Sequence, residues 1–231
     1  MLFVVNPKSG KARIKNHLLD ITDLFIKAGY EVHVHITQKP GDAVEVIKNR
    51  EDGYNIIVCS GGDGTLDEVV NGMVLSNRMK PIGYIPAGST NDFANSLGLP
   101  SNMKKAAQIV VEGEKFACDI GSFNSEIFVY VAAFGMFTDV SYGTEQELKN
   151  ALGHMAYVLE GVKRLASIKS YRLKISYADT VLEGDFIYGM VTNSVSVGGF
   201  KNLTGKNVEL NDGEFEVMLV KRPANALELN K

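Results

Sequence analysis

One stretch, residues 55–72 (NIIVCSGGDGTLDEVVNG), constrains the fold of this chain more than any other. Its apolar run at residues 56–59 is typical of a strand that is buried on both faces of a parallel sheet. Three glycines follow within residues 60–64, and apolar residues then recur from Leu66 to Val74 with the spacing of one helix face. This order of strand, glycine loop and helix predicts an anion-binding loop, because unpaired backbone N–H groups and the positive end of the helix dipole converge there.

Asp63 places a carboxylate inside that loop. A carboxylate would repel a bare phosphate, so a Mg²⁺ ion that bridges Asp63 and nucleotide phosphates would explain its presence. The alternative is that Asp63 and Thr65 only form a turn and cap the helix, as these residue types often do. The stretch alone leaves both interpretations open.

The composition is that of an ordinary globular protein, with 231 residues, of which 45% are hydrophobic and 22% charged. The net charge of −3 provides no general basic field, so we expect no nucleic acid partner. Cys59 and Cys118 match no metal-ligand spacing and are expected to be buried free thiols in a reducing cytosol. The longest apolar run, residues 127–137, falls well short of the roughly 20 residues that span a bilayer. We therefore expect a cytoplasmic protein, and peripheral association with the inner face of the membrane stays open.

The first half of the chain alternates short strands with helices, which predicts an α/β fold with an open parallel sheet. Val32, Val34 and Ile36 alternate with polar residues, which is typical of a half-buried strand. The other expected strands are residues 2–5, 56–59 and 81–86. The expected helices begin near Ile14, Asp42, Leu66, Phe93 and Met103, the last of them capped by Ser101.

The pattern changes near Gly121, where longer strands replace the regular alternation. We expect a mostly antiparallel, β-rich and sandwich-like second half. Its expected strands are residues 128–134, 171–177, 182–193 and 213–221, with one long helix over residues 148–166. We therefore divide the chain into an α/β nucleotide-binding domain, residues 1–121, and a β-rich domain, residues 122–231.

Three loops of the first half share one context, because each follows a strand and precedes a helix. They are residues 6–10 (NPKSG), 61–65 (GGDGT) and 86–93 (PAGSTNDF). Ligands of an open parallel sheet bind beyond the carboxyl ends of its strands, so all three loops are expected at the binding edge.

These three loops, together with the DIG sequence at residues 119–121, resemble the soluble bacterial diacylglycerol kinase family, which is related to sphingosine and ceramide kinases. GGDGT alone also occurs in NAD kinases and phosphofructokinases, whereas GSTNDF together with NPxSG is more specific to lipid kinases. The resemblance covers essentially the whole chain. It implies ATP- and Mg-dependent transfer of the γ-phosphoryl group to a lipid hydroxyl, with diacylglycerol converted to phosphatidate in the cleft between the two domains.

The resemblance also implies roles for individual residues. Asp63 would be catalytic, and Asp63, Asp92 and Asp119 would hold the catalytic Mg²⁺ through water molecules. The residues that would bind ATP are Asn6, Pro7, Lys8, Ser9, Gly10, Thr37, Gly61, Gly62, Asp63, Gly64, Thr65, Leu66, Asp67, Glu68, Thr90 and Asn91. A structural Mg²⁺ would be bound by Glu209, Asp212 and Glu214, for which the alternative is a solvated hairpin turn at residues 211–213.

Two features depart from the family pattern. The family usually has asparagine where this chain has Asp67, whose carboxylate would either weaken nucleotide binding or face solvent. The family's proposed general base lies in a later segment, whereas the last residues here, up to Lys231, are typical of a helix that is just beginning. We therefore expect the sequence to be a fragment or a shortened form, with the general base beyond Lys231.

The expected partner is a lipid substrate at a membrane surface, and a homodimer stays open. Phe134, Met136 and Phe137 could line an apolar pocket for the lipid. The basic residues Lys163, Arg164, Lys169, Arg172 and Lys174 could contact anionic head groups or simply form a solvated face. Two other functions remain alternatives: a kinase for NAD or another small molecule, and a nucleotide-binding module without catalysis.

Overall fold

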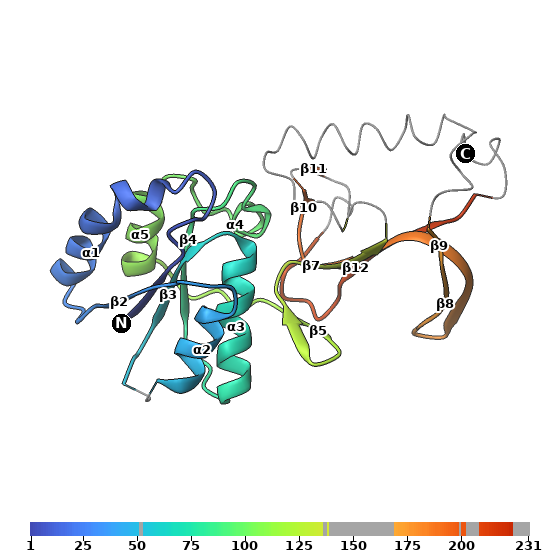
Figure 1. Ribbon diagram of the computed structural model, residues 1–231, viewed down its shortest axis with the longest axis horizontal. Coiled ribbons are helices and arrows are strands. Elements are labelled where there is room, and N and C mark those ends of the chain that lie inside the picture. The colour runs from blue at the N-terminus through green and yellow to red at the C-terminus, as the bar shows by residue number, and fades with distance from the viewer. Residues whose placement is uncertain (51–52, 136–137, 139–168, 199, 202–207, 224–231) are drawn as a thin grey trace.

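The computed structural model describes residues 1–50, 53–135, 138, 169–198, 200–201 and 208–223 (Figure 1). The first half is built on a parallel four-stranded sheet in the order β2-β1-β3-β4. Its strands are β1 (Leu2–Val5), β2 (His33–Ile36), β3 (Ile57–Gly61) and β4 (Ile82–Pro86). The chain passes from β1 to one side and then returns to the other, so the strand order reverses beside β1, where ligands of such sheets bind.

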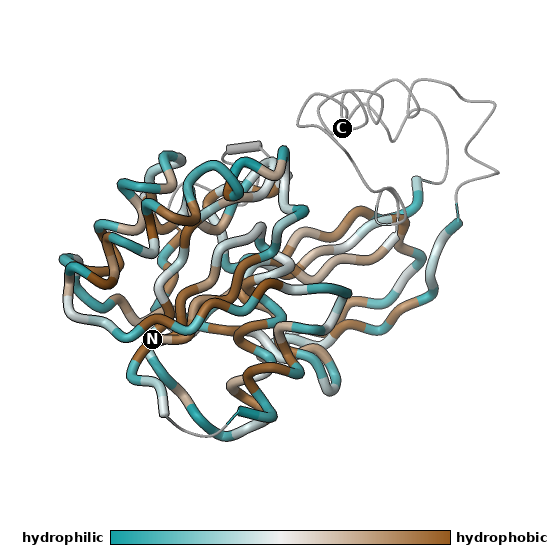
Figure 2. Tube along the Cα trace, turned by 60° about the vertical axis from the view of Figure 1, so that its left-hand side comes forward, coloured by the Kyte–Doolittle hydropathy of each residue, from teal (hydrophilic) through white to brown (hydrophobic). Residues whose placement is uncertain are grey.

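Helices cover both faces of this sheet (Figure 1). They are the 3-10 helix η1 (Arg13–Asn16) and the α-helices α1 (Leu18–Lys27), α2 (Asp42–Asn49), α3 (Asp63–Ser76), α4 (Asp92–Ser96) and α5 (Met103–Glu112). On one face, Phe25 of α1 and Ala106 of α5 pack with Phe3 of the sheet. On the other face, Val69 of α3 packs with Val4. Figure 2 shows hydrophobic residues concentrated along the strands between these layers, which confirms the predicted α/β arrangement.

The second half is antiparallel. A long strand, β9, is paired by β12 and β7 along its second part and by β8 along its first part. The strands are β5 (Gly121–Phe123), β6 (Glu126–Phe128), β7 (Val131–Gly135), β8 (Tyr171–Tyr177), β9 (Thr180–Thr192), β10 (Ser196–Val197), β11 (Phe200–Lys201) and β12 (Glu216–Lys221). The predicted β-rich second half is therefore confirmed. The predicted helix at residues 148–166 lies outside the described residues.

Three local predictions were wrong. The strand expected at residues 128–134 is two strands, β6 and β7, because Tyr130 leaves the β5–β6 hairpin and its carbonyl accepts bonds from Thr192 and Asn193 at the end of β9. The helix expected from Ile14 begins as 3-10 helix η1, and only Leu18 starts α1. Asn102, not Ser101, caps α5 by accepting hydrogen bonds from two backbone N–H groups.

The strand β2 is less buried than its alternation predicts. Val34 and Ile36 are 39% and 42% exposed. His35 lies on the opposite face, half-buried, with its Nε2 atom 3.2 Å from a carboxylate oxygen of Asp42. Because β2 is an edge strand of the sheet, its apolar side chains are not fully covered.

Asn71 of α3 ties the first half of the chain to β6. Its amide nitrogen donates to the carbonyl of Ile127 (2.7 Å), and its amide oxygen accepts the N–H of the same residue (2.9 Å). The side chain thereby pairs with Ile127 as a neighbouring strand would. The two halves are thus joined by hydrogen bonds on a buried side chain.

We expect Asn71→Ala to lower the free energy of unfolding by roughly 2–3 kcal/mol, because both backbone groups of Ile127 lose their partner. Urea denaturation would measure the change. Asn49→Ala is the matched control, since Asn49 is exposed at the end of α2 and should change stability little. Equal stability of the two variants would contradict this role of Asn71.

Candidate active site

The three glycine loops contact one another at the carboxyl ends of β1, β3 and β4. A Cβ atom at Gly10 would lie 2.6 Å from the carbonyl oxygen of Ala87, and Gly10 has a positive φ of 54°. A Cβ atom at Gly62 would lie 3.3 Å from the Cα atom of Gly88 and 3.6 Å from the hydroxyl of Ser9. Only residues without side chains allow such close approach of three backbones. The predicted convergence of the loops is therefore present.

Asn6 and Thr65 hold two of these loops together. The Asn6 amide donates to the Thr65 hydroxyl (3.0 Å), and its amide oxygen accepts the backbone N–H of Lys8 (3.0 Å). In the third loop, the side chain of Asn91 bonds to both the N–H and the carbonyl of Gly88. These side chains give the loops fixed shapes before any ligand binds.

Asp63 lies at the first residue of α3 and faces the third loop. One carboxylate oxygen accepts the backbone N–H of Asp92 (3.1 Å), and the other accepts the hydroxyl of Tyr84 (3.3 Å). Partial burial and the nearby charge of Asp92 raise the pKa of Asp63 to about 6. At neutral pH the group is mostly ionised, and no described lysine, arginine or histidine forms an ion pair with it. A carboxylate of this kind fits a hydrated Mg²⁺ ion, which prefers oxygen ligands.

Asp92 is the most buried acid of the site, with 1% of its surface exposed. Its carboxylate accepts hydrogen bonds from the hydroxyls of Ser196 (2.7 Å) and Tyr130 (3.0 Å). Both donors belong to the second half of the chain, so Asp92 lies where the two halves meet.

Asp119 binds a different segment, residues 209–214. Its carboxylate accepts the N–H of Gly213 (2.7 Å), and its own N–H donates to the carbonyl of Leu210 (2.7 Å). The strand β12 follows this turn and pairs with β9, whereas residues 202–207, which precede it, lie outside the described residues. The three residues predicted to bind a structural Mg²⁺ are all exposed: Glu209, Asp212 and Glu214.

Within the part of the chain that the structure describes, no three His, Cys, Asp or Glu side chains are close enough to hold a metal ion directly. Asp63 and Asp92 are neighbours, and residues 193–196 connect Asp119 with them: Asn193 donates to the Asp119 carbonyl, and Ser196 donates to Asp92. Water-mediated binding of the catalytic Mg²⁺ by Asp63, Asp92 and Asp119 remains a prediction. Binding of a structural Mg²⁺ by the second set of acids, with help from backbone carbonyls, also remains a prediction.

Several residues predicted to bind the nucleotide also make contacts within the protein. The Glu68 carboxylate accepts the N–H groups of Gly41 (3.0 Å) and Ala43 (3.3 Å) and so closes the N-terminus of α2. Leu66 is 3% exposed and belongs to the core. Thr37 follows β2, where its N–H donates to the Val5 carbonyl (2.9 Å). The backbone carbonyl of Thr90 accepts from Asn95 (3.2 Å).

Asp67 is half-buried, and its carboxylate accepts the N–H of Val129 (2.8 Å). It therefore connects α3 with the segment after β6 rather than facing bulk solvent alone. Burial raises the pKa of Asp67 to about 6.

The raised pKa predicts a pH-dependent effect of Asp67→Asn. The folded protein binds the proton more tightly than the unfolded chain, so this group's contribution to stability is complete below about pH 4 and is lost as the pH rises through about 6. An asparagine oxygen can still accept the Val129 N–H but carries no charge. We expect the free energy of unfolding of the variant to exceed that of the wild type by roughly 1–2 kcal/mol at about pH 7.5. Near pH 4 the two proteins should have the same free energy of unfolding. Urea denaturation at both pH values would measure this, and a gain of equal size at both would contradict it.

Of the predicted basic residues that the structure describes, two are in exposed cross-strand ion pairs. Arg172 lies 3.6 Å from Asp185, and Lys174 lies 3.7 Å from Glu183. Lys169 stacks over the ring of Tyr171. The ring of Tyr171 also contacts Phe134 edge-on. Lys163, Arg164, Met136 and Phe137 lie outside the described residues.

Three residues of the site were missed by sequence reasoning: Tyr84, Tyr130 and Ser196. Tyr84 and Tyr130 lie in or beside apolar strand patterns, where a tyrosine is ordinarily a core residue. The polar run TNSVS at residues 192–196 was the available signal, because its first three residues and Ser196 are fully or nearly fully buried.

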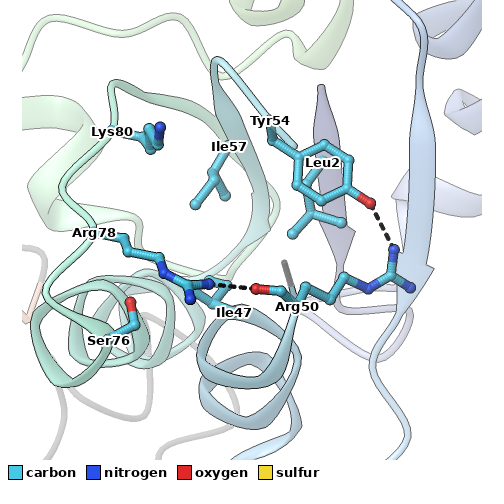
Figure 3. A pocket seen from close by; sticks show the side chains of 8 residues that line it. All are labelled: Leu2, Ile47, Arg50, Tyr54, Ile57, Ser76, Arg78 and Lys80. Atoms are coloured by element: carbon cyan, nitrogen blue, oxygen red, sulfur yellow. Dashed lines mark hydrogen bonds between the residues drawn. The ribbon is translucent and has the colours of Figure 1, made fainter. Parts of the chain in front are cut away.

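The pocket shown in Figure 3 lies at the opposite edge of the sheet. Leu2 and Ile57, the first residues of β1 and β3, line it together with Tyr54. Arg78 donates to the carbonyl of Arg50 at the end of α2, and Arg50 donates to the hydroxyl of Tyr54 (2.8 Å). These bonds stabilise the end of α2, and the pocket is separate from the site formed by the three loops.

No helix within the described ranges is both long enough and apolar enough to cross a membrane. Cys59 and Cys118 are both free thiols, Cys59 buried and Cys118 half-buried.

Comparison with known proteins adds independent information. Residues 1–123 match the family described as the diacylglycerol kinase catalytic domain. The chain is 38% identical over 229 residues to a diacylglycerol kinase of Bacillus subtilis (strain 168), which covers 97% of this chain and 74% of the relative. It is 37% identical over 227 residues to a diacylglycerol kinase of Staphylococcus saprophyticus, with 98% of this chain and 74% of the relative covered.

A solved structure has the same fold. The crystal structure of a diacylglycerol kinase from Bacillus anthracis str. Sterne superposes with a TM-score of 0.75 at 26% sequence identity, covering 99% of this chain and 76% of that one. The family match, the relatives and the shared fold agree with the three loops at the sheet edge. The chain belongs to the diacylglycerol kinase family of lipid kinases.

Proposed function

We propose that this lipid kinase transfers the γ-phosphoryl group of ATP, in a Mg²⁺-dependent reaction, to the free hydroxyl of diacylglycerol and so forms phosphatidate. The observation that carries the proposal is the contact of three glycine loops beside the Asp63 carboxylate. The names of the relatives support diacylglycerol as the acceptor.

The chain's own groups suit this reaction. Backbone N–H groups of the loops and the N-terminus of α3 would bind phosphate oxygens, as helix N-termini do. Asp63 would hold the hydrated metal ion, with Asp92 and Asp119 in support. When bound, Mg²⁺ neutralises charge that develops on the transferring phosphoryl group. Phosphoryl transfer otherwise needs mainly positioning, which the interlocked loops supply.

The lipid would reach the site from the second half of the chain. We propose that residues 1–121 bind the nucleotide and that residues 122–231 present the acceptor from a membrane surface. Among the described residues, Phe134 in β7, which packs edge-on against Tyr171, and Lys169, which lies over the same ring, best suit this contact. Oligomerisation as a homodimer is compatible with this scheme.

The direct test follows labelled γ-phosphate from ATP into a panel of acceptors: diacylglycerol, ceramide and sphingosine in mixed micelles, and NAD in solution. Labelled phosphatidate that requires Mg²⁺ and disappears with a chelator is the expected result. Labelling of NAD instead would replace the proposal with the small-molecule alternative. ATP-dependent thermal stabilisation without transfer to any acceptor would replace it with a binding module.

A further inference from the structure

The carboxylate of Asp92 is held by the second half of the chain. Ser196 and Tyr130 each donate a hydroxyl hydrogen bond to it, at 2.7 and 3.0 Å, and its side chain is almost wholly buried. The backbone N–H of Asp92 in turn donates to the Asp63 carboxylate (3.1 Å). A continuous line of hydrogen bonds therefore runs from the second half of the chain to the acid proposed for catalysis.

Tyr130 is itself fixed at both of its polar ends. Its hydroxyl oxygen accepts the N–H of Gly198 (2.9 Å), which leaves its proton to point at Asp92. Its backbone carbonyl accepts the Thr192 hydroxyl (2.7 Å) and the Asn193 N–H (3.1 Å) at the end of β9. Burial and the charge of Asp92 raise the pKa of Tyr130, so the hydroxyl stays a donor at any working pH.

The other end of α4 is held by the same segment. The hydroxyl of Ser96 lies 2.7 Å from that of Ser194 and accepts the N–H of Val195 (3.1 Å). The short helix that carries Asp92 is thus bound at its first and last residues by residues 194–196. A helix of one turn has little stability of its own, so these contacts determine where it lies.

We infer that Tyr130 is a positioning residue of the phosphoryl-transfer site: through Asp92 it sets the orientation of Asp63 and couples it to the strand that ends at Thr192. The inference rests on the function proposed above. The hydroxyl of Tyr130 donates its hydrogen bond to Asp92, and Asp92 in turn bonds to Asp63, so Tyr130 acts through another residue rather than on the reacting atoms. A small displacement of the acid is enough to matter, because a shift of about 1 Å can cost about 100-fold in rate.

Tyr130→Phe tests the inference, because it removes only the hydroxyl. We expect kcat with diacylglycerol to fall about 10- to 100-fold, the effect of losing one hydrogen bond to a charged group. The KM for ATP should stay within about twofold, because the hydrogen bonds of Tyr130 go to Asp92, Thr192, Asn193 and Gly198 and to none of the residues proposed to bind ATP. Tyr188→Phe is the matched control: Tyr188 is also a half-buried tyrosine of the second half, and its hydroxyl contacts the Met190 sulfur (3.4 Å). Its kcat should match the wild type.

A second readout is independent of turnover. Amide hydrogen exchange should rise at least tenfold across residues 92–96 in Tyr130→Phe and stay unchanged along α3, whereas Tyr188→Phe should change neither. Ser196→Ala removes the other donor and should lower kcat about 10-fold with the same KM pattern, which keeps the test valid if Tyr130→Phe folds poorly.

Wild-type kcat in both Tyr130→Phe and Ser196→Ala, or wild-type exchange across residues 92–96, would overturn the inference. So would an equal loss of kcat in the Tyr188→Phe control. If the wild-type protein itself fails to phosphorylate diacylglycerol, the proposed function falls, and the exchange measurement still decides whether Tyr130 holds the helix of Asp92.

Discussion

Asp63→Asn is expected to lower kcat for diacylglycerol phosphorylation by at least about 10³-fold, the upper range for removing one charge-stabilising group. The substitution keeps the shape of the side chain. Its amide oxygen can still accept the Asp92 N–H, and its amide nitrogen can donate to the Tyr84 hydroxyl. What it removes is the negative charge that would hold the metal ion. Initial rates of label transfer at saturating ATP and lipid would measure the loss.

Stability should move in the opposite direction from activity. Burial disfavours the charged form of Asp63 and raises its pKa to about 6, so a neutral asparagine should leave the free energy of unfolding at neutral pH equal or higher. Asp23→Asn, at an exposed ion pair on α1, removes the same charge far from the loops and should keep wild-type kcat. If Asp63→Asn keeps more than about a tenth of the wild-type kcat, its assigned role is wrong.

Much of the first half could be predicted because its signals are local. The apolar run at residues 56–59, the three glycines and the helix face after them lie within one stretch, and the structure has β3, the loop and α3 there. The parallel sheet follows from repeating that unit, since each strand must cross over to the next. The contact of the three loops could be inferred without knowing any distance, because parallel strands end at one edge.

The failures have a common physical cause. The break between β6 and β7 lies inside an uninterrupted apolar run, and it is made by partners far along the chain: Asp67 for Val129, and Thr192 for Tyr130. Local composition does not report such partners. The carboxylates of Asp67 and Glu68 have hidden partners of the same kind, since each accepts backbone N–H groups from a segment distant in the sequence. The nucleotide-binding roles that the family resemblance implies for both residues remain predictions.

Gly88→Val is expected to abolish measurable ATP binding, because it removes the contact on which the three-loop site depends. A Cβ atom at Gly88 would lie 2.7 Å from the Cα atom of Gly62 and 2.8 Å from the side-chain oxygen of Asn91. Neither neighbour can give way easily: the first is backbone of the loop before α3, and the second is held by two bonds to Gly88 itself. The second and third loops must therefore move apart. Overpacking of this kind costs about 1–3 kcal/mol of stability, and titration calorimetry with MgATP would measure the binding.

Gly53→Ala controls for the general effect of replacing a glycine, since a Cβ atom at Gly53 would meet nothing within 4 Å. This control should bind MgATP as the wild type does and unfold at the same urea concentration. Gly88→Val should remain folded, because the loss of about 1–3 kcal/mol is smaller than the stability of a typical domain. A folded Gly88→Val that binds MgATP with wild-type affinity would show that the nucleotide does not depend on the contact between the GGDGT and GSTNDF loops. The site would then have to be sought away from the carboxyl ends of β3 and β4, because those two loops are the ones the substitution separates.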